Sequence, residues 1–104
     1  MPRYLFVYHG GSAPESEEEG RQAMAAWGDW FASMGKDVVD GGNPVGDSTT
    51  VKSDGSIMHS GGANPTTGYS VVDAKDLDDA IAKARGCPIL GTGGSVEVAE
   101  TFEP

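Results

Sequence analysis

The sequence predicts an α+β protein of the ferredoxin-like type, with the element order βαββαβ and one inserted β-hairpin. Strand-like runs alternate with two segments of helical periodicity, and an Asp-Gly pair separates two short β-like runs near the middle of the chain. At 104 residues the chain has about the size of one domain. No repeat or linker divides it, so we expect a single domain over residues 1–104.

The first two elements carry the clearest signals. Residues 4–8 are aromatic or aliphatic throughout and precede a Gly-Gly pair, which predicts a strand that is apolar on both faces. After Pro14, a favourable first helical residue, large apolar side chains recur at intervals of three and four as far as Met34. This spacing predicts a long amphipathic helix, which Gly35 is placed to end.

The middle of the chain is rich in turn residues. A strand is expected over residues 36–39, and residues 48–52 and 56–59 have the pattern of the two hairpin strands. The Asp-Gly pair between them is a strong hairpin signal because glycine readily adopts the positive φ that a tight turn needs. The stretch 60–67 contains no large apolar residue and is expected to be a loop.

The last third of the chain predicts one more strand, helix and strand. GYSVVDA, residues 68–74, has strand character, and the segment 76–85 has apolar residues at helical spacing with a glycine after it. A final strand is expected around Val96 and Val98, which Phe102 could extend.

Composition excludes several classes of function. Sixteen acidic and seven basic residues give a formal charge of −9, so phosphate backbones and anionic lipid repel the chain, and we expect neither nucleic-acid nor membrane binding. The N-terminal apolar run is too short for a signal peptide, and a cytoplasmic protein is expected. Cys87 is the single cysteine, which excludes an internal disulfide, and we interpret it as a buried residue instead of a nucleophile.

The predicted architecture also bears on oligomeric state. Two helices can cover only one face of a four-stranded sheet, whereas the first strand is apolar on both sides. An exposed apolar sheet face of several hundred Å² is unusual for a monomer. We therefore expect a homodimer that packs through the sheet face.

Four residues are the candidates for chemistry or ligand binding. His9 and His59 fall at strand ends, where imidazoles could act as base and acid, or could be ordinary residues at the edge of a loop. Tyr69 could offer a hydroxyl to a ligand or simply pack. Asp40 could orient a histidine or bind a ligand, although Asp beside glycine commonly caps a turn.

No feature of the sequence calls for a metal or a cofactor. The histidines have no further ligands at recognisable spacing, and the glycine-rich loops lack the lysine and the strand-to-helix setting of a phosphate-binding loop. Glu97 alternates with Val96 and Val98 and is expected to face solvent.

Six stretches carry a resemblance to a known family. They are RYLFVYHG, ASMGK, DGGNPV, STTVKSDG, GYSVVDAKDLDDAIAKARGCP and GGSVEVAE, of which the last two are the most specific. On these, nearly the whole chain resembles the YCII-related family, also known by its Asp-Gly-Pro-Phe tetrapeptide. The resemblance implies a dimeric α+β barrel in which two ferredoxin-like units join face to face.

The chain departs from that family at two places. The tetrapeptide is replaced by His59 and the Ser-Gly-Gly that follows it, and the first helix lacks the histidine that some relatives carry with an aspartate near the helix end. That pair, proposed for acid-base chemistry in the relatives, has no counterpart here.

Three functions therefore remain open. The first is a small homodimeric protein with a cleft for a small organic ligand and no catalytic set. The second is a small-molecule isomerase, lyase or cofactor-free oxygenase that uses His9 or His59 as base with Tyr69 assisting. The third, implied by the resemblance alone, is an accessory role beside transcriptional regulators through protein partners.

Overall fold

The computed structural model describes residues 1–104. Its elements follow the predicted order, with two short 3-10 turns in addition. They are β1 (Arg3–His9), α1 (Glu17–Met34), η1 (Gly35–Asp37), β2 (Val38–Asp40), β3 (Thr50–Val51), β4 (Ile57–Met58), β5 (Thr66–Asp73), α2 (Leu77–Ala84), η2 (Pro88–Thr92) and β6 (Ser95–Glu100).

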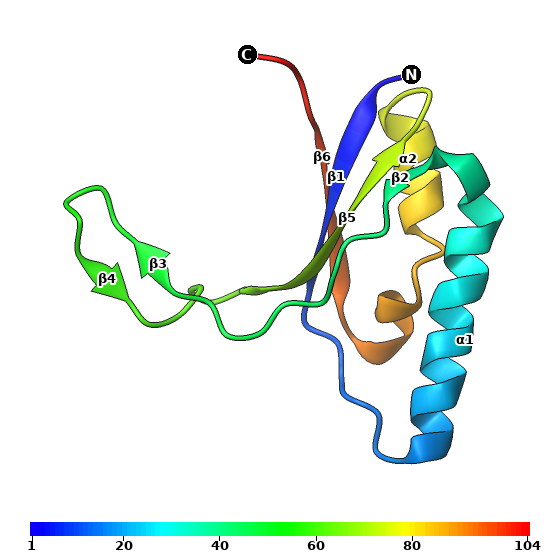
Figure 1. Cartoon of the computed structure of the whole chain (residues 1–104), viewed down its shortest axis with the longest axis horizontal. Helices are drawn as coiled ribbons and strands as arrows, with labels where there is room; N and C mark the ends of the chain where they lie inside the picture. The colour runs from blue at the N-terminus through cyan, green and yellow to red at the C-terminus, as the bar shows by residue number, and fades with distance from the viewer.

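Four strands form one antiparallel sheet in the order β2-β5-β1-β6. Both helices lie on the same side of this sheet, and its other side carries no helix (Figure 1). This is the ferredoxin-like strand order, so the predicted α+β architecture is confirmed. We call the side without helices the open face.

The alternation of side chains along β1 divides the sheet into a core face and the open face. Tyr4, Phe6 and Tyr8 are buried on the helix side, whereas Leu5 and Val7 are half-buried on the open face. Antiparallel pairing places further side chains with Leu5 and Val7 on the open face, from Tyr69, Val71, Glu97 and Ala99.

Aromatic rings make up much of the core between β1 and α1. The rings of Phe6 and Trp30 stack with their centroids 6.2 Å apart, and those of Tyr8 and Trp27 meet edge to face at 5.1 Å. Such offset and edge-to-face pairs are the favourable arrangements of aromatic rings. The second half of the apolar stripe predicted from the helical spacing, from Trp27 to Met34, is thus the face of α1 that packs on the sheet, whereas Met24 is exposed.

The two helices are joined through one side chain and a small charge cluster. Trp30 Nε1 donates a hydrogen bond to the Lys83 carbonyl at 2.9 Å. This bond connects α1 to the last turn of α2. Lys83 Nζ lies 2.8 Å from Asp79 and 3.3 Å from Asp37, so it links α2 to the turn after α1. Cys87 is buried beside this junction, where burial raises the pKa of its thiol to about 11.

Several predicted boundaries were wrong by a few residues. Helix α1 begins at Glu17 and not at Pro14, because the Ser16 hydroxyl accepts a hydrogen bond from the Glu19 amide and caps the helix there. Strand β5 begins at Thr66, inside the predicted loop. Strand β6 ends at Glu100, which leaves Phe102 outside the sheet and 87% exposed.

The predicted hairpin is confirmed and stands away from the rest of the molecule. Strands β3 and β4 pair antiparallel around a turn in which Gly55 has φ 86°. Figure 1 shows this hairpin extending from the sheet on the side opposite the helices. We call residues 47–62 the arm. The chain contains no helix with the length and apolar character needed to cross a membrane.

Residues after β2 continue along the edge of β5 and come very close to it. The Asn43 carbonyl accepts a hydrogen bond from the Tyr69 amide at 3.3 Å, and Val45 donates one to the Thr67 carbonyl. Gly42 has φ 71°, and a Cβ there would lie 1.7 Å from the Tyr69 carbonyl oxygen. Only glycine fits at this position, both because of its backbone conformation and because of its neighbour.

The close approach at Gly42 gives a testable expectation for stability. Gly42→Ala should lower the free energy of unfolding by at least about 2 kcal/mol, because the new methyl group collides with the backbone of β5. Gly41→Ala is the matched control, since a Cβ at Gly41 meets no atom within 4 Å. Urea unfolding followed by tryptophan fluorescence measures both, and equal stabilities of the two variants would contradict the expectation.

Candidate functional site

A cleft of about 330 Å³ lies between α1, the edge of the sheet and the loop after β2. Three aromatic side chains, from Tyr8, Trp27 and Phe31, form one wall. Residues 41–44 and 67–69 form the opposite side, and Ile89 contributes from η2. The cleft therefore exists because α1 packs its aromatic stripe on β1 while the edge loop closes over β5.

A chain of hydrogen bonds links the cleft wall to the loop. The Tyr8 hydroxyl donates to Ser70 Oγ at 2.7 Å, and Ser70 Oγ donates in turn to the Gly41 carbonyl at 2.6 Å. Burial raises the pKa of the Tyr8 hydroxyl above its usual value of 10.0, so it stays neutral. With its proton directed at Ser70, the Tyr8 oxygen can accept a hydrogen bond but has none to give.

The lining of the cleft determines what it can hold. No charged side chain reaches it, and its polar groups are hydroxyls, the Asn43 amide and backbone. Its volume is near the lower limit of small-molecule sites, which run from about 300 to 1,000 Å³. A flat, uncharged molecule of about one ring fits this combination of aromatic wall, size and charge.

His9 lies at the other side of the sheet and is tied to two acceptors. It is buried at the end of β1 on the open face, where Nε2 lies 2.8 Å from Glu97 Oε1 and Nδ1 lies 3.2 Å from the Pro65 carbonyl. Both partners can only accept hydrogen bonds, so the imidazole satisfies both only when both of its nitrogens carry protons.

This geometry sets the charge state of His9. The hydrogen bond to Glu97 is the main cause that raises the pKa of His9 above 6.5, against the opposing effect of burial. Because both nitrogens are occupied, neither offers a free lone pair to take a proton from a substrate. His9 is therefore better suited to donate a proton than to act as a base.

The other candidate residues are placed apart from His9. His59 is exposed and lines a separate polar hollow of about 390 Å³ at the base of the arm, together with Asp47. Neither histidine lines the aromatic cleft. The carboxylate of Asp40 accepts a hydrogen bond from the Gly42 amide at 2.8 Å, an arrangement that holds the turn. Tyr69 lines the edge of the cleft, with its hydroxyl 3.5 Å from the Asn43 side chain.

Sequence reasoning missed the residues that build the cleft and the partner of His9. Trp27 and Phe31 have the spacing of a core stripe, and nothing in that spacing separates a core residue from the wall of a cleft. Ser70 carried a usable signal, because it is a polar residue at a buried position of an alternating strand. Glu97 was expected in solvent; its side chain is 64% exposed, but it also reaches across the open face to His9.

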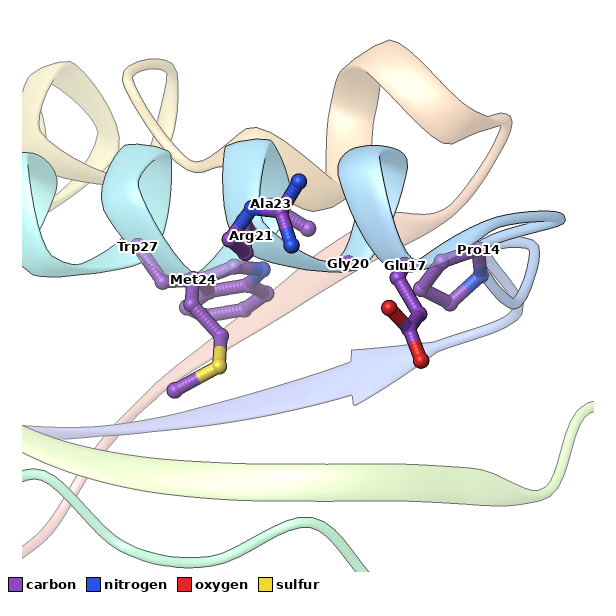
Figure 2. A pocket seen from close by; sticks show the side chains of 7 residues that line it. All are labelled: Pro14, Glu17, Gly20, Arg21, Ala23, Met24 and Trp27. Atoms are coloured by element: carbon purple, nitrogen blue, oxygen red, sulfur yellow. The ribbon is translucent and has the colours of Figure 1, made fainter.

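A larger hollow of about 730 Å³ runs along the first half of α1. Figure 2 shows Met24 and Trp27 projecting from one side of the helix, with Pro14 and Glu17 towards its beginning. It is an open groove without a converging set of polar groups, and Met24 is 78% exposed in it. Trp27 lines both hollows, so this groove leads towards the aromatic cleft.

Comparisons with known proteins show the fold alone. No protein-family model matches the chain, and no curated protein matches it. Among solved structures it is similar to a 5-chloro-2-hydroxyhydroquinone dehydrochlorinase from Burkholderia phenoliruptrix AC1100, whose structure is a complex with 2,5-dihydroxybenzoquinone. The identity is 16%, the TM-score is 0.56, and the match covers 96% of this chain and 95% of that one.

The charge state of His9 can be tested by titration. Glu97→Gln should lower the pKa of His9, because it removes the carboxylate that favours the imidazolium. Since the folded-state pKa is raised, the pair stabilises the fold below pH 6.5, and this contribution is lost as the pH rises through the folded-state value. In Glu97→Gln the free energy of unfolding should fall less than in the wild type over the same rise in pH.

The measurement is an NMR titration of the imidazole protons in a His59→Gln background, which leaves one histidine to follow. Glu100→Gln removes a carboxylate from the same strand without touching His9 and serves as the control. An equal fall of the His9 pKa in both variants would show that Glu97 has no specific effect.

Proposed function

We propose that this protein binds a small, flat, uncharged organic molecule in the cleft lined by Tyr8, Trp27 and Phe31. The observation that carries the proposal is the combination of an aromatic wall, a volume of about 330 Å³ and the absence of charged groups. The Tyr8 oxygen, whose proton points to Ser70, is available to accept a hydrogen bond from a ligand hydroxyl. A hydroxylated aromatic ring meets each of these conditions.

The structural neighbour supports the choice of this ligand class. Its name describes an enzyme that acts on a chlorinated hydroxyhydroquinone, and it is a complex with a dihydroxybenzoquinone. A shared fold does not transfer an activity, but it makes a ring with hydroxyl groups the natural first probe. Together with the sequence motifs, it also supports our proposal that the chain is a relative of the YCII-related proteins.

Binding is favoured over catalysis by the position of the ionisable groups. The cleft contains no group that is ready to exchange a proton near neutral pH, because the pKa of Tyr8 is raised and both histidines lie elsewhere. An acid-base enzyme is the second candidate, and the pairing of His9 with Glu97 is the observation in its favour. Such an enzyme would use His9 as a proton donor from the open face.

We further propose that the protein is a homodimer whose subunits pack through their open faces. Half-buried Leu5, Val7 and Val71 lie on that face, beside Val39 on the edge strand. A compact monomer of this mass exposes about 5,500 Å². The chain exposes 6940 Å², about 1,400 Å² more. A standard interface needs about 800 Å² from each partner, so the excess is large enough for one.

Ligand binding can be tested with hydroquinone by isothermal titration calorimetry. Hydroquinone should bind, and cyclohexane-1,4-diol, which carries the same two hydroxyls on a ring that is not flat, should not. Trp27→Ala should weaken hydroquinone binding roughly tenfold or more, because it removes the largest of the three rings in the aromatic wall. Met24→Ala removes an exposed side chain one turn earlier on α1 and should leave the affinity unchanged. Equal binding of the two ligands would overturn the proposal.

The dimer can be tested by light scattering at micromolar concentration, where the mass should be twice 10.7 kDa. Val7→Lys should yield the monomer, because it places a charge in the proposed interface on the open face. The monomer itself should still fold, because Glu97, the cross-strand neighbour of residue 7, is acidic and tolerates a lysine beside it. Leu90→Lys, at an exposed position on the helix side, is the control and should remain dimeric. A wild-type protein that is monomeric under these conditions would refute the dimer.

A further inference from the structure

The arm, residues 47–62, packs against the rest of its own chain at its base and makes no hydrogen bond to it. Every hydrogen bond that its residues make joins two residues of the arm. None of the residues in the arm is buried. Its two strands have two residues each. A two-stranded hairpin by itself is marginally stable in water, so a hairpin this short needs a surface to pack against.

The base of the arm nevertheless has a defined structure. Thr50 Oγ1 donates a hydrogen bond to the Ser60 carbonyl at 2.7 Å and ties the two sides of the arm together. A Cβ at Gly61 would lie 2.7 Å from the Cβ of Pro65 and 2.9 Å from that of Ser48, so the chain is closely packed there. The Pro65 carbonyl is in turn held by His9. The arm therefore leaves the sheet in a fixed direction.

Two aliphatic side chains lie together on one face of the arm. Val51 and Ile57 are directly paired across the two strands, and side chains paired in this way lie on the same face of a hairpin. They are 70% and 58% exposed. These two exposed aliphatic side chains lie side by side on a hairpin whose outer strand edges are unpaired, so they are available for contact with another surface.

We propose that the arm of each subunit crosses to a second copy of this chain and packs its Val51–Ile57 face against it. The occupant is a second copy because the arm projects on the open-face side of the sheet, where the second subunit of the proposed dimer would lie (Figure 1). The radius of gyration, 15.0 Å, also exceeds the roughly 13 Å of a compact chain of this length, as an exchanged arm requires. The inference extends the homodimer proposed above and uses its open-face geometry.

The first experiment compares dimer dissociation constants by analytical ultracentrifugation. The double variant Val51→Thr/Ile57→Thr keeps β-branched side chains but removes apolar surface from four positions in each dimer. Its dissociation constant should rise about 100-fold. The control Lys52→Thr/Ser56→Thr alters the neighbouring positions of the same hairpin and should change the constant less than about twofold. A double variant at positions 51 and 57 that dimerises like the wild type would overturn the inference.

The second experiment uses the unaltered chain, so it does not depend on how a variant folds. Amide hydrogen exchange across residues 47–62 should be slow in the dimer and should become fast when the protein is diluted below its dissociation constant. Fast amide hydrogen exchange in residues 47–62 of a stable dimer would contradict the proposal that each arm packs against the other subunit.

The two proposals fail in different ways. If Val7→Lys gives a monomer while Val51→Thr/Ile57→Thr has no effect, the open-face dimer stands and the exchanged arm does not. If Val51→Thr/Ile57→Thr dissociates and Val7→Lys stays dimeric, the contact between the arm and the second subunit is confirmed and the open-face contact is refuted. A monomeric wild type refutes both.

Discussion

The packing of the β1 aromatic rings on the tryptophans of α1 is the contact on which the remaining structure depends. Phe6 on Trp30 and Tyr8 on Trp27 fix the helix over the middle of the sheet, and the rings of Tyr8 and Trp27 also form part of the wall of the cleft. Because side chains alternate along a strand, directing these rings to the helices turns Leu5 and Val7 to the other side. The aromatic cleft and the uncovered face thus both follow from the alternation of side chains along β1.

Local patterns were enough to predict the elements but not the contacts between them. The hairpin was predicted correctly because its Asp-Gly turn is a signal within four residues, whereas the start of α1 was placed too early because Pro14 competes with the cap at Ser16. The pairing of His9 with Glu97 joins residues that are 88 positions apart. It follows from the register of β1 with β6, which no local pattern encodes.

Each face of the sheet has one group of hydrogen-bonded polar side chains, and the two groups connect different parts of the chain. On the helix side, Tyr8 donates a hydrogen bond to Ser70, and Ser70 donates one to the Gly41 carbonyl, so these bonds connect the wall of the cleft to its opposite rim. On the open side, His9 connects β6 with Pro65, at the base of the arm. His9 therefore contacts the segment that carries the arm and does not line the aromatic cleft.

Cys87 gives the protein a built-in reporter of core opening. It is the single thiol of the chain, it is buried, and its pKa is raised to about 11, so in the closed core it is shielded from reagents and is almost entirely protonated. Alkylating agents react with the thiolate and need access to it. The rate at which Cys87 is labelled consequently measures how often the junction of the two helices opens, without any engineered probe.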